Sequence, residues 1–459
     1  MSVVALTPNE QSMLDGAQGA GTALAMRIVV RLAQAMGANE LLAISGAHID
    51  SCLYHGQSGL DFVHRLASGG ATVQVPTTLN VSSLDLLHPE LYQGDADQAA
   101  ASRELMHAYV SLGCEPTWTC APYQREQRPA RGQHVAWAES NAIVFANSVL
   151  GARTHRYSDF IDIAAAVTGR VPDAGLHRAE NRVATTVVDV GDLSDRLLAT
   201  DAVYPVIGYL VGRYCGSSIP AIVGLPAGVE EHNLKALGAA AASSGSLAMF
   251  HAVGVTPEAP TLEAACGGGG VPEDDGRRRI TAAECRRARD ELSVRIGGEP
   301  GSSLATVSLG TPHYSVREIG ILTELLAGRT VHPSVDVYVS TGREVLTEAG
   351  LRGWVEPLIG AGVALRLVSL QQGDGVTLHS TAQPGNPLSA LPLDRHRRSD
   401  GTAQILRHRG SVRGDLGPVE DHRAIHVHNR PTSGLQPVGG ISQHGDAVAP
   451  GPTLVGVGE

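Results

Sequence analysis

The amino-acid sequence predicts an α/β fold with several parallel sheets, divided into more than one subdomain. Segments with the apolar spacing of helices alternate with short apolar or β-branched runs, a pattern typical of parallel sheets covered by helices. The chain has 459 residues, more than one hydrophobic core usually serves, so two or three packed subdomains are expected. Polar residues follow several of the short runs, and open α/β sheets bind ligands at the carboxyl ends of their strands.

The individual elements follow from this spacing. Residues 8–36 have the period of a helix, and residues 41–44 form a short apolar run that leads into a polar loop. The unit repeats with a helix over 60–68 and a β-branched strand over 71–75, separated by a helix-breaking Gly-Gly pair. Later apolar segments that continue the pattern are 183–190, 219–225, 247–255, 305–309 and 335–340.

Two stretches of unusual composition divide the chain. The loop over 267–279, G-G-G-G-V-P-E-D-D-G-R-R-R, precedes a charged helix, and we expect a subdomain boundary near it. After about Leu370 the chain contains no Phe, Tyr, Trp, Cys or Met, yet it holds seven of the 19 histidines. Such a composition does not support a packed core, so a poorly ordered tail is expected.

Charge and hydropathy exclude several classes of function. The net charge is −11, without the clustered cations that phosphate backbones require, so no nucleic acid is expected as a partner. No basic N-terminal stretch precedes an apolar run, and no run of about 18 apolar residues occurs later. We therefore expect a cytoplasmic protein with no membrane segment. Six irregularly spaced cysteines are typical of reduced thiols, some of which can bind metal.

Three dense polar stretches mark the candidate pocket. They are A-H-I-D-S-C-L-Y-H-G at 47–56, V-P-T-T-L-N at 75–80 and G-C-E-P-T-W-T-C-A-P-Y-Q at 113–124, and the last leads into residues 136–154. Each places small, thiol, amide or cationic groups where a plain core has apolar side chains. Such a concentration predicts a polar pocket.

These stretches resemble aconitase X, a family of iron-dependent hydro-lyases in the aconitase superfamily. Four further strings follow in the family's order and spacing: T-G-R-V-P-D-A-G-L-H at 168–177, G-V-T-P-E-A-P-T-L-E at 254–263, L-G-T-P-H-Y-S at 309–315 and S-T-G-R-E-V at 340–345. The resemblance implies an aconitase-like catalytic large domain with several subdomains over residues 1–364. The remaining residues, 365–459, form the atypical tail.

The resemblance also implies a reaction and a cofactor. A small hydroxy acid loses a hydroxyl group, an iron centre polarises that hydroxyl, and a base removes the neighbouring proton. The cofactor is then an iron-sulfur cluster or iron. Cys120 matches the family's cluster-binding cysteine, although a lone cysteine is more often a small buried thiol. Cys52 and Cys114 are further candidate ligands, but neither spacing is a metal signature. Some archaeal relatives have another ligand cysteine where this chain has Thr311.

Candidate catalytic and binding groups follow the predicted strands. The resemblance assigns His48 and Asp50 to orienting the substrate or an iron-bound water, whereas a helix N-cap with a solvated histidine is the structural alternative. Thr77, Thr78 and Asn80 suit a substrate carboxylate at a helix start, or else only cap that helix.

Other candidates lie in an apolar helical stretch and in a later block. Asn141, Asn147 and Ser148 either bind substrate or bond to neighbouring loops, because buried polar groups need partners. Arg153 ends this stretch and is a natural bidentate partner for a carboxylate, which makes it the expected substrate anchor. His313 is a candidate proton carrier or cluster neighbour, or else a hydrogen-bonded core histidine.

The resemblance stops after the strand at 360–364. The family continues with an Asp-Thr-Cys block and an Asn-Ser-Gly-Lys-like block, and neither occurs in this chain. A reading-frame shift near Leu365 is a hypothesis that explains both this loss and the composition of the tail. Without the Asp-Thr-Cys cysteine, Cys120 lacks its family partner, and one thiolate cannot hold a cluster alone.

The resemblance leaves the partner and the substrate to be tested. The family uses a small swivelling domain, fused or separate, whose Gly-Ser-Ser-Ser run offers a serine base, and this chain has no such run. A small partner subunit is therefore implied, or the chain is a truncated, inactive relative. Bacterial relatives with the His-Ile-Asp block convert cis-3-hydroxy-L-proline to Δ1-pyrroline-2-carboxylate, which is the expected reaction. Archaeal relatives dehydrate mevalonate 5-phosphate, which is the alternative.

Overall fold

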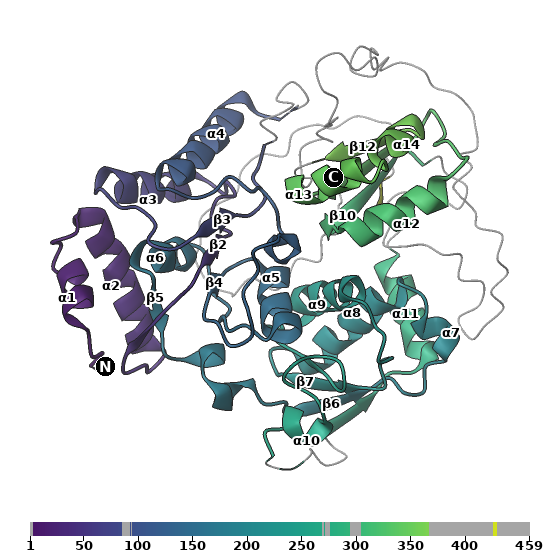
Figure 1. Cartoon of the computed structure of the whole chain (residues 1–459), viewed down its shortest axis with the longest axis horizontal. Helices are drawn as coiled ribbons and strands as arrows, with labels where there is room; N and C mark the ends of the chain where they lie inside the picture. The colour runs from purple at the N-terminus through teal and green to yellow at the C-terminus, as the bar shows by residue number, and fades with distance from the viewer. Residues whose placement is uncertain are drawn as a thin grey trace, which may run out of the picture.

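The structure, a computed structural model, describes residues 3–84, 92, 94–268, 270, 276–293, 304–366 and 426–428. Three large clusters of buried hydrophobic residues mark a first part (residues 3–182), a second part (183–293) and a third part (304–366). Figure 1 shows the first part at the left, the second at the lower right and the third at the upper right. The expected α/β class is confirmed, because parallel sheets and helices occur in all three parts.

The first part carries most of the predicted polar stretches. Its helices and strands are α1 (Pro8–Leu14), α2 (Ala20–Ala35), β1 (Leu41–Ala43), β2 (Ala47–Ile49), α3 (Gln57–Ser68), β3 (Thr77–Leu79), α4 (Ala96–Ser111), η2 (Pro122–Gln124), β4 (Ala136–Trp137), α5 (Ser140–Phe145), the π-helical turn η3 (Ala146–Leu150), α6 (Ile161–Thr168), β5 (Arg170–Pro172), η4 (Gly175–His177) and η5 (Ala179–Arg182). Strands β3, β2 and β4 form a parallel sheet in that order, and β1 pairs antiparallel with β5.

The second part is a four-stranded parallel sheet with the order β8-β7-β6-β9. Its elements are β6 (Thr186–Asp189), α7 (Asp195–Leu198), α8 (Val203–Cys215), β7 (Pro220–Val223), α9 (Glu231–Gly245), β8 (His251–Ala252), α10 (Leu262–Ala265), β9 (Arg277–Arg279) and α11 (Ala282–Leu292). Helices α8 and α9 pack backbone against backbone, since a Cβ atom on Gly245 would lie 2.0 Å from the Gly212 carbonyl oxygen. Only glycine allows this approach.

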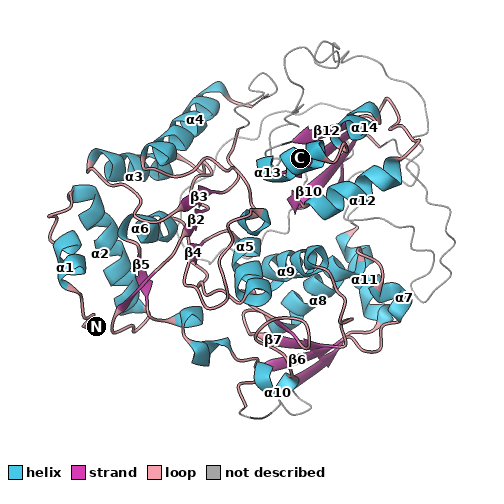
Figure 2. Ribbon diagram, in the orientation of Figure 1, coloured by secondary structure: helices cyan, strands magenta, loops and turns pink. Residues whose placement is uncertain are grey.

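The third part has the sheet order β12-β11-β10-β13, in which the first three strands are parallel and β13 is antiparallel to β10. Its elements are β10 (Thr306–Tyr314), α12 (Val316–Leu326), β11 (Asp336–Thr341), α13 (Arg343–Leu351), α14 (Val355–Gly360), β12 (Val363–Arg366) and β13 (His426–His428). Figure 2 shows α12, α13 and α14 packed around the strands of this part. No helix in the described part of the chain has the length and apolar character to cross a membrane.

Two predicted boundaries fall within elements of the structure. The last residues of the loop over 267–279 form β9, which pairs with β6 inside the second sheet. The expected boundary at residue 364 falls within β12, which pairs with β11. Apart from β12 and β13, the predicted tail lies outside the described residues.

Candidate active site

Three polar side chains meet at the carboxyl ends of the parallel strands β2, β3 and β4. The amide nitrogen Nδ2 of Asn80 donates to Oδ1 of Asp50 and, over 3.0 Å, to Oε2 of Glu139. The pairing of Ile49 with Leu79 explains the contact, because the residues that follow paired parallel strands emerge side by side. We call Asp50, Asn80 and Glu139 the strand-end cluster.

Asp50 has an unusual charge state within this cluster. Burial raises the pKa of its carboxyl well above the ordinary value, and the negative charges of Glu139 and Asp159 raise it further, against the lowering effect of the Asn80 amide. Like charges this close cannot all ionise at neutral pH. Burial and the neighbouring charges therefore favour the protonated form of Asp50, the form that can donate a proton.

The buried carboxylate of Asp162, at the start of α6, fixes the loop that follows β2. It accepts hydrogen bonds from the backbone amides of Asp50 at 2.8 Å and Ser51 at 3.0 Å, and from Ser51 Oγ at 2.9 Å. Burial is the main reason why the pKa of Asp162 rises to about 6. The position of Asp50 thus depends on a second buried acid.

His48 lies on β2 beneath the strand-end cluster and is completely buried. Its Nδ1 is 2.8 Å from the hydroxyl of Thr78, on the paired strand β3, and its Nε2 has no hydrogen-bond partner among the described residues. Burial, followed by the positive charge of Arg125, lowers the pKa of His48 to about 3. The imidazole is therefore neutral and holds one nitrogen ready for a ligand.

Cys120 and His313 come together although 193 positions separate them. The His313 amide donates to Cys120 Sγ over 3.3 Å, and Thr119 Oγ1 lies 3.0 Å from His313 Nδ1. The backbone carbonyl of Cys120 accepts from Asn141, whose amide also donates to Glu139 over 2.8 Å. Cys120 is thus linked to the strand-end cluster through one side chain.

His313 is also the point at which the three parts of the molecule meet. Its backbone carbonyl accepts from Gln124 Nε2 of the first part at 2.9 Å and from Lys235 Nζ of the second part at 3.0 Å. Lys235 is buried on α9 and forms an ion pair with Glu318 of α12. The His313 imidazole is completely buried, and its Nε2 has no partner among the described residues.

Unpartnered buried polar atoms outline the space that a ligand would fill. Besides His48 Nε2 and His313 Nε2, they include Asn80 Oδ1, Ser82 Oγ and Gln124 Oε1. Native proteins rarely bury polar atoms without a partner, so their concentration around one cluster favours a bound polar molecule.

Some predicted site residues lie elsewhere and serve the fold. Thr77 Oγ1 donates to the Val75 carbonyl over 2.8 Å. Asn147 is completely buried and bonds to the backbone of Thr154, whereas Ser148 accepts from the Phe250 amide at 2.9 Å. These bonds join the first and second parts, so Asn147 and Ser148 follow the structural alternative.

Arg153 also lies away from the strand-end cluster. Its Nη1 donates to the backbone carbonyl of His177 over 2.7 Å, and its side chain lines a shallow cavity of about 260 Å³ together with Arg131 and Glu258. This cavity contains no member of the strand-end cluster. The expected role of Arg153 as substrate anchor therefore has no support from its position.

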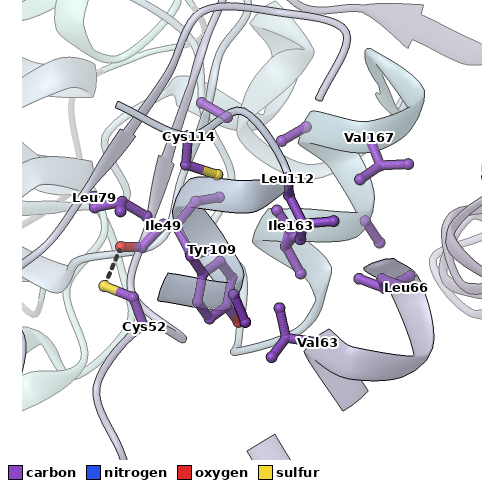
Figure 3. Packing of buried hydrophobic residues seen from close by; sticks show 14 of the residues in the cluster. Ile49, Cys52, Val63, Leu66, Leu79, Tyr109, Leu112, Cys114, Ile163 and Val167 are labelled. Atoms are coloured by element: carbon purple, nitrogen blue, oxygen red, sulfur yellow. Dashed lines mark hydrogen bonds between the residues drawn. The ribbon is translucent and has the colours of Figure 1, made fainter. Parts of the chain in front are cut away.

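Cys52 and Cys114 belong to the hydrophobic core of the first part. Figure 3 shows both thiols among Ile49, Leu79 and Tyr109. Cys52 Sγ donates to the Ile49 carbonyl over 3.5 Å, and burial raises the pKa of both thiols, that of Cys114 to about 12. A metal ligand must be a thiolate. Burial raises the pKa of the Cys120 thiol as well, so the thiols differ in their surroundings, and Cys120 is the one that lies against His313.

The described residues do not fit a complete iron centre. No group of three or more His, Cys, Asp or Glu side chains within the described ranges is placed to hold a metal ion. Cys120 is the one thiol bonded to His313, and the chain has no cysteine after Cys285. A cluster needs several protein ligands, so the chain needs ligands from outside the described residues to bind one.

Sequence reasoning missed Glu139, Asp162, Gln124 and Lys235. Glu139 follows β4 as Asp50 follows β2, so a prediction of β4 as a third parallel strand would have found it. The other three have no local signal, because long-range packing places Asp162 beneath β2 and brings Gln124 and Lys235 against His313.

Comparisons with known proteins agree with this architecture. Family models of the aconitase X first, second and third domains match residues 3–180, 184–290 and 304–367. A crystal structure of aconitase X from Thermococcus kodakaraensis in its holo-form superposes with a TM-score of 0.71 at 31% identity. That match covers 80% of this chain and 89% of the other.

Curated relatives of two kinds match most of this chain. A cis-3-hydroxy-L-proline dehydratase from Pseudomonas aeruginosa is 42% identical over 78% of this chain, and one from Hypocrea jecorina is 40% identical over 78%. The chain spans 60% and 59% of the length of these two proteins. A phosphomevalonate dehydratase large subunit from Methanothermobacter thermautotrophicus is 35% identical, and the match covers 78% of this chain and 86% of that subunit. This chain belongs to the aconitase X family.

Proposed function

We propose that the chain is the large component of a hydro-lyase that removes water from cis-3-hydroxy-L-proline to give Δ1-pyrroline-2-carboxylate. The two curated relatives at 42% and 40% identity carry that substrate in their names, whereas the phosphomevalonate relative is 35% identical. The observation that carries the proposal is the strand-end cluster, in which Asp50 retains a proton beside the carboxylate of Glu139.

Elimination of water needs an acid at the leaving hydroxyl and a base at the neighbouring carbon. The Asp50 carboxyl supplies the proton as the C3–O bond breaks, and the electrons of the C2–H bond form the double bond between C2 and C3. The enamine product then tautomerises to the cyclic imine. His48 Nε2 and Asn80 Oδ1 are unpartnered and positioned to orient the ring substituents.

The base that takes the C2 proton comes from a small partner in this proposal. The phosphomevalonate relative is named a large subunit, which supports a separate small subunit in the family. Family resemblance places a serine base on the small swivelling domain, within a Gly-Ser-Ser-Ser run that does not occur in this sequence.

We also propose that Cys120 is the contribution of this chain to an iron centre. Its thiol lies beside His313 and is linked through Asn141 to the strand-end cluster. Burial, and then the charge of Glu139, raise its pKa to about 12, so only a bound cation would hold it as a thiolate at neutral pH. The described residues do not complete an iron centre. The protonation of the leaving hydroxyl is therefore assigned to Asp50 alone.

An assay of the chain co-expressed without oxygen with a candidate small subunit tests the proposal. We expect conversion of cis-3-hydroxy-L-proline, and a loss of roughly 100-fold or more in D50N, the size of effect that general acids have. The exposed Asp61, on α3, gives the matched control D61N, which should keep full activity. Activity in D50N equal to that of the unsubstituted chain would exclude Asp50 as the acid.

Mevalonate 5-phosphate is the second candidate substrate. It is supported by the phosphomevalonate dehydratase large subunit from Methanothermobacter thermautotrophicus, which is 35% identical over 78% of this chain. Parallel assays with both substrates distinguish them. If neither is converted with any small subunit, the chain is the inactive relative.

A further inference from the structure

Arg156 lies on a segment that runs beside strand β4 in the same direction. His134 and Arg153 form a parallel bridge between the two stretches of chain. Thr154 continues the contact, because its Oγ1 accepts a hydrogen bond from the Trp137 amide at 3.1 Å. Both stretches therefore advance together toward the carboxyl end of β4, where the strand-end cluster lies.

The same segment then passes along the strand-end cluster. After Arg156 it reaches Asp159, whose charge acts on Asp50, and then Asp162, which accepts from the Asp50 amide. Burial lowers the pKa of Arg156, and the negative charge of Glu139 opposes this shift. Arg156 therefore lies on the side of the cluster near Glu139. Asp159 and Asp162 lie on the side near Asp50.

Most hydrogen-bond donors of Arg156 are unused. Its Nη1 donates to the backbone carbonyls of Leu247 over 3.3 Å and Ala242 over 3.5 Å, both at the end of α9. Its Nε and Nη2 donate to no described residue. Guanidinium groups have five donors in a planar fork, and half-buried ones usually have most of them satisfied.

The other cations near the site are already paired. Arg125, whose charge acts on His48, bonds to Glu115 and Glu344 over 2.7 Å each. Lys235 is paired with Glu318. Of these three cations of the described site, Arg156 is the one that is not paired with a described carboxylate.

A substrate carboxylate needs such a cation at this place. The site already contains the carboxyls of Glu139, Asp159 and Asp162 beside Asp50, and those that are ionised repel a further negative charge. The guanidinium fork matches a carboxylate with two parallel hydrogen bonds and keeps its charge when half-buried.

We propose that Arg156 binds the carboxylate of the cyclic amino-acid substrate through Nε and Nη2. It takes the role that the sequence suggested for Arg153, which instead bonds to His177 and lines a separate cavity. The inference rests on the proposed function, because it assigns one binding contact within that same site.

Binding of L-proline, which cannot lose water, tests the contact independently of turnover. We would measure its affinity and that of L-prolinamide by calorimetry, with the full-length chain alone and with a co-expressed small subunit. Prolinamide has the same ring but no carboxylate. We expect the unsubstituted chain to prefer L-proline, and R156Q to lose roughly 30- to 100-fold in affinity for L-proline with little change for prolinamide.

R156K and R131Q complete the design. R156K keeps the positive charge but lacks the planar guanidinium. It should therefore recover only part of the preference for L-proline over L-prolinamide. Arg131 is an exposed arginine outside the cluster and should tolerate R131Q without effect. If R156Q misfolds, it loses affinity for both ligands, and R156K becomes the test. A full preference of R156K for L-proline over prolinamide would contradict a bidentate contact through the guanidinium.

The outcomes separate this inference from the proposed function. L-proline binding that survives R156Q but disappears in R153Q would overturn the assignment to Arg156 alone. An unsubstituted chain that binds no L-proline, with or without the small subunit, would overturn both the proposed substrate and the contact.

Discussion

At the scale of single residues, the site depends on keeping His48 uncharged inside the protein. Its pKa is about 3 when folded and about 6.5 when unfolded, so the neutral form is favoured by folding. A base with a lowered pKa contributes stability that is fully present above pH 6.5 and is lost as pH falls toward 3.

We therefore predict that H48Q changes the acid sensitivity of the protein. Between pH 7 and pH 4.5 the free energy of unfolding of the unsubstituted chain should fall by about 3 kcal/mol more than that of H48Q. Urea unfolding followed by circular dichroism at both pH values measures this difference. The exposed His107, on α4, provides the control H107Q, which should match the unsubstituted chain. Equal pH dependence of all three proteins would contradict the prediction.

The sequence predicted the members of the site that follow β2 and β3 better than those that long-range packing supplies. His48, Asp50 and Asn80 lie where parallel strands end, and the structure brings them together. The sequence pointed to Arg153 as the substrate anchor and did not single out Arg156, because only the direction of the chain beside β4 separates the two. The local sequence pattern indicates that an arginine near this position binds the substrate. Which arginine reaches the site depends on tertiary contacts.

At the scale of elements, helix α9 is joined to the third part by the only lysine of the chain. The chain has 35 Lys and Arg residues, and the other 34 are arginines. The Lys235 ammonium bonds to two oxygens at once, the Glu318 carboxylate and the His313 carbonyl, in a buried space. A compact ammonium fits this arrangement, and a planar guanidinium does not.

We predict that K235M lowers the free energy of unfolding by about 2–3 kcal/mol, because the bonds of the buried ammonium to Glu318 and to the His313 carbonyl are lost, while Ser315 still donates to Glu318. K235R should cost about 1–3 kcal/mol through overpacking. The control is R317M, which removes an exposed ion pair between Arg317 of α12 and Glu230 at the start of α9 and should cost no more than about 1 kcal/mol. Similar losses in K235M and R317M, measured by urea unfolding, would refute a special role for the lysine.

The elements themselves were predicted with shifts that have physical causes. The helix expected over 8–36 is two helices, because Gly16 and Gly19 between them have positive φ angles of 86° and 99°. The strand expected over 71–75 begins instead at Thr77, where the pairing with β2 starts. Short parallel strands take their bounds from their neighbours, which a local pattern does not contain.

At the scale of the whole molecule, the family resemblance ends close to the end of β12, the last of the parallel strands in the third part. The third-domain model ends at residue 367, and β12 ends at Arg366. A shift of reading frame near Leu365 predicts that the corrected frame encodes the missing Asp-Thr-Cys block directly after β12. Resequencing the genomic locus checks this, and an uninterrupted frame that encodes the present tail would rule it out.

The last prediction concerns the metal content of the complete chain. Cys120 is the one thiol bonded to His313, and the described ranges contain no group of three metal-binding side chains. One thiolate cannot retain a cluster, so the chain purified alone without oxygen should contain far less than one iron and one inorganic sulfide per molecule. A chain rebuilt with the corrected frame should bind iron, and C120S in that chain should lose it, while C285S, which changes a buried thiol on α11, should not. Iron and sulfide analysis of the present chain and of the chain with the corrected frame measures this difference. Stoichiometric iron in the present chain would instead mean that ligands beyond the described residues complete the centre, and the missing cysteine would not explain any loss of activity.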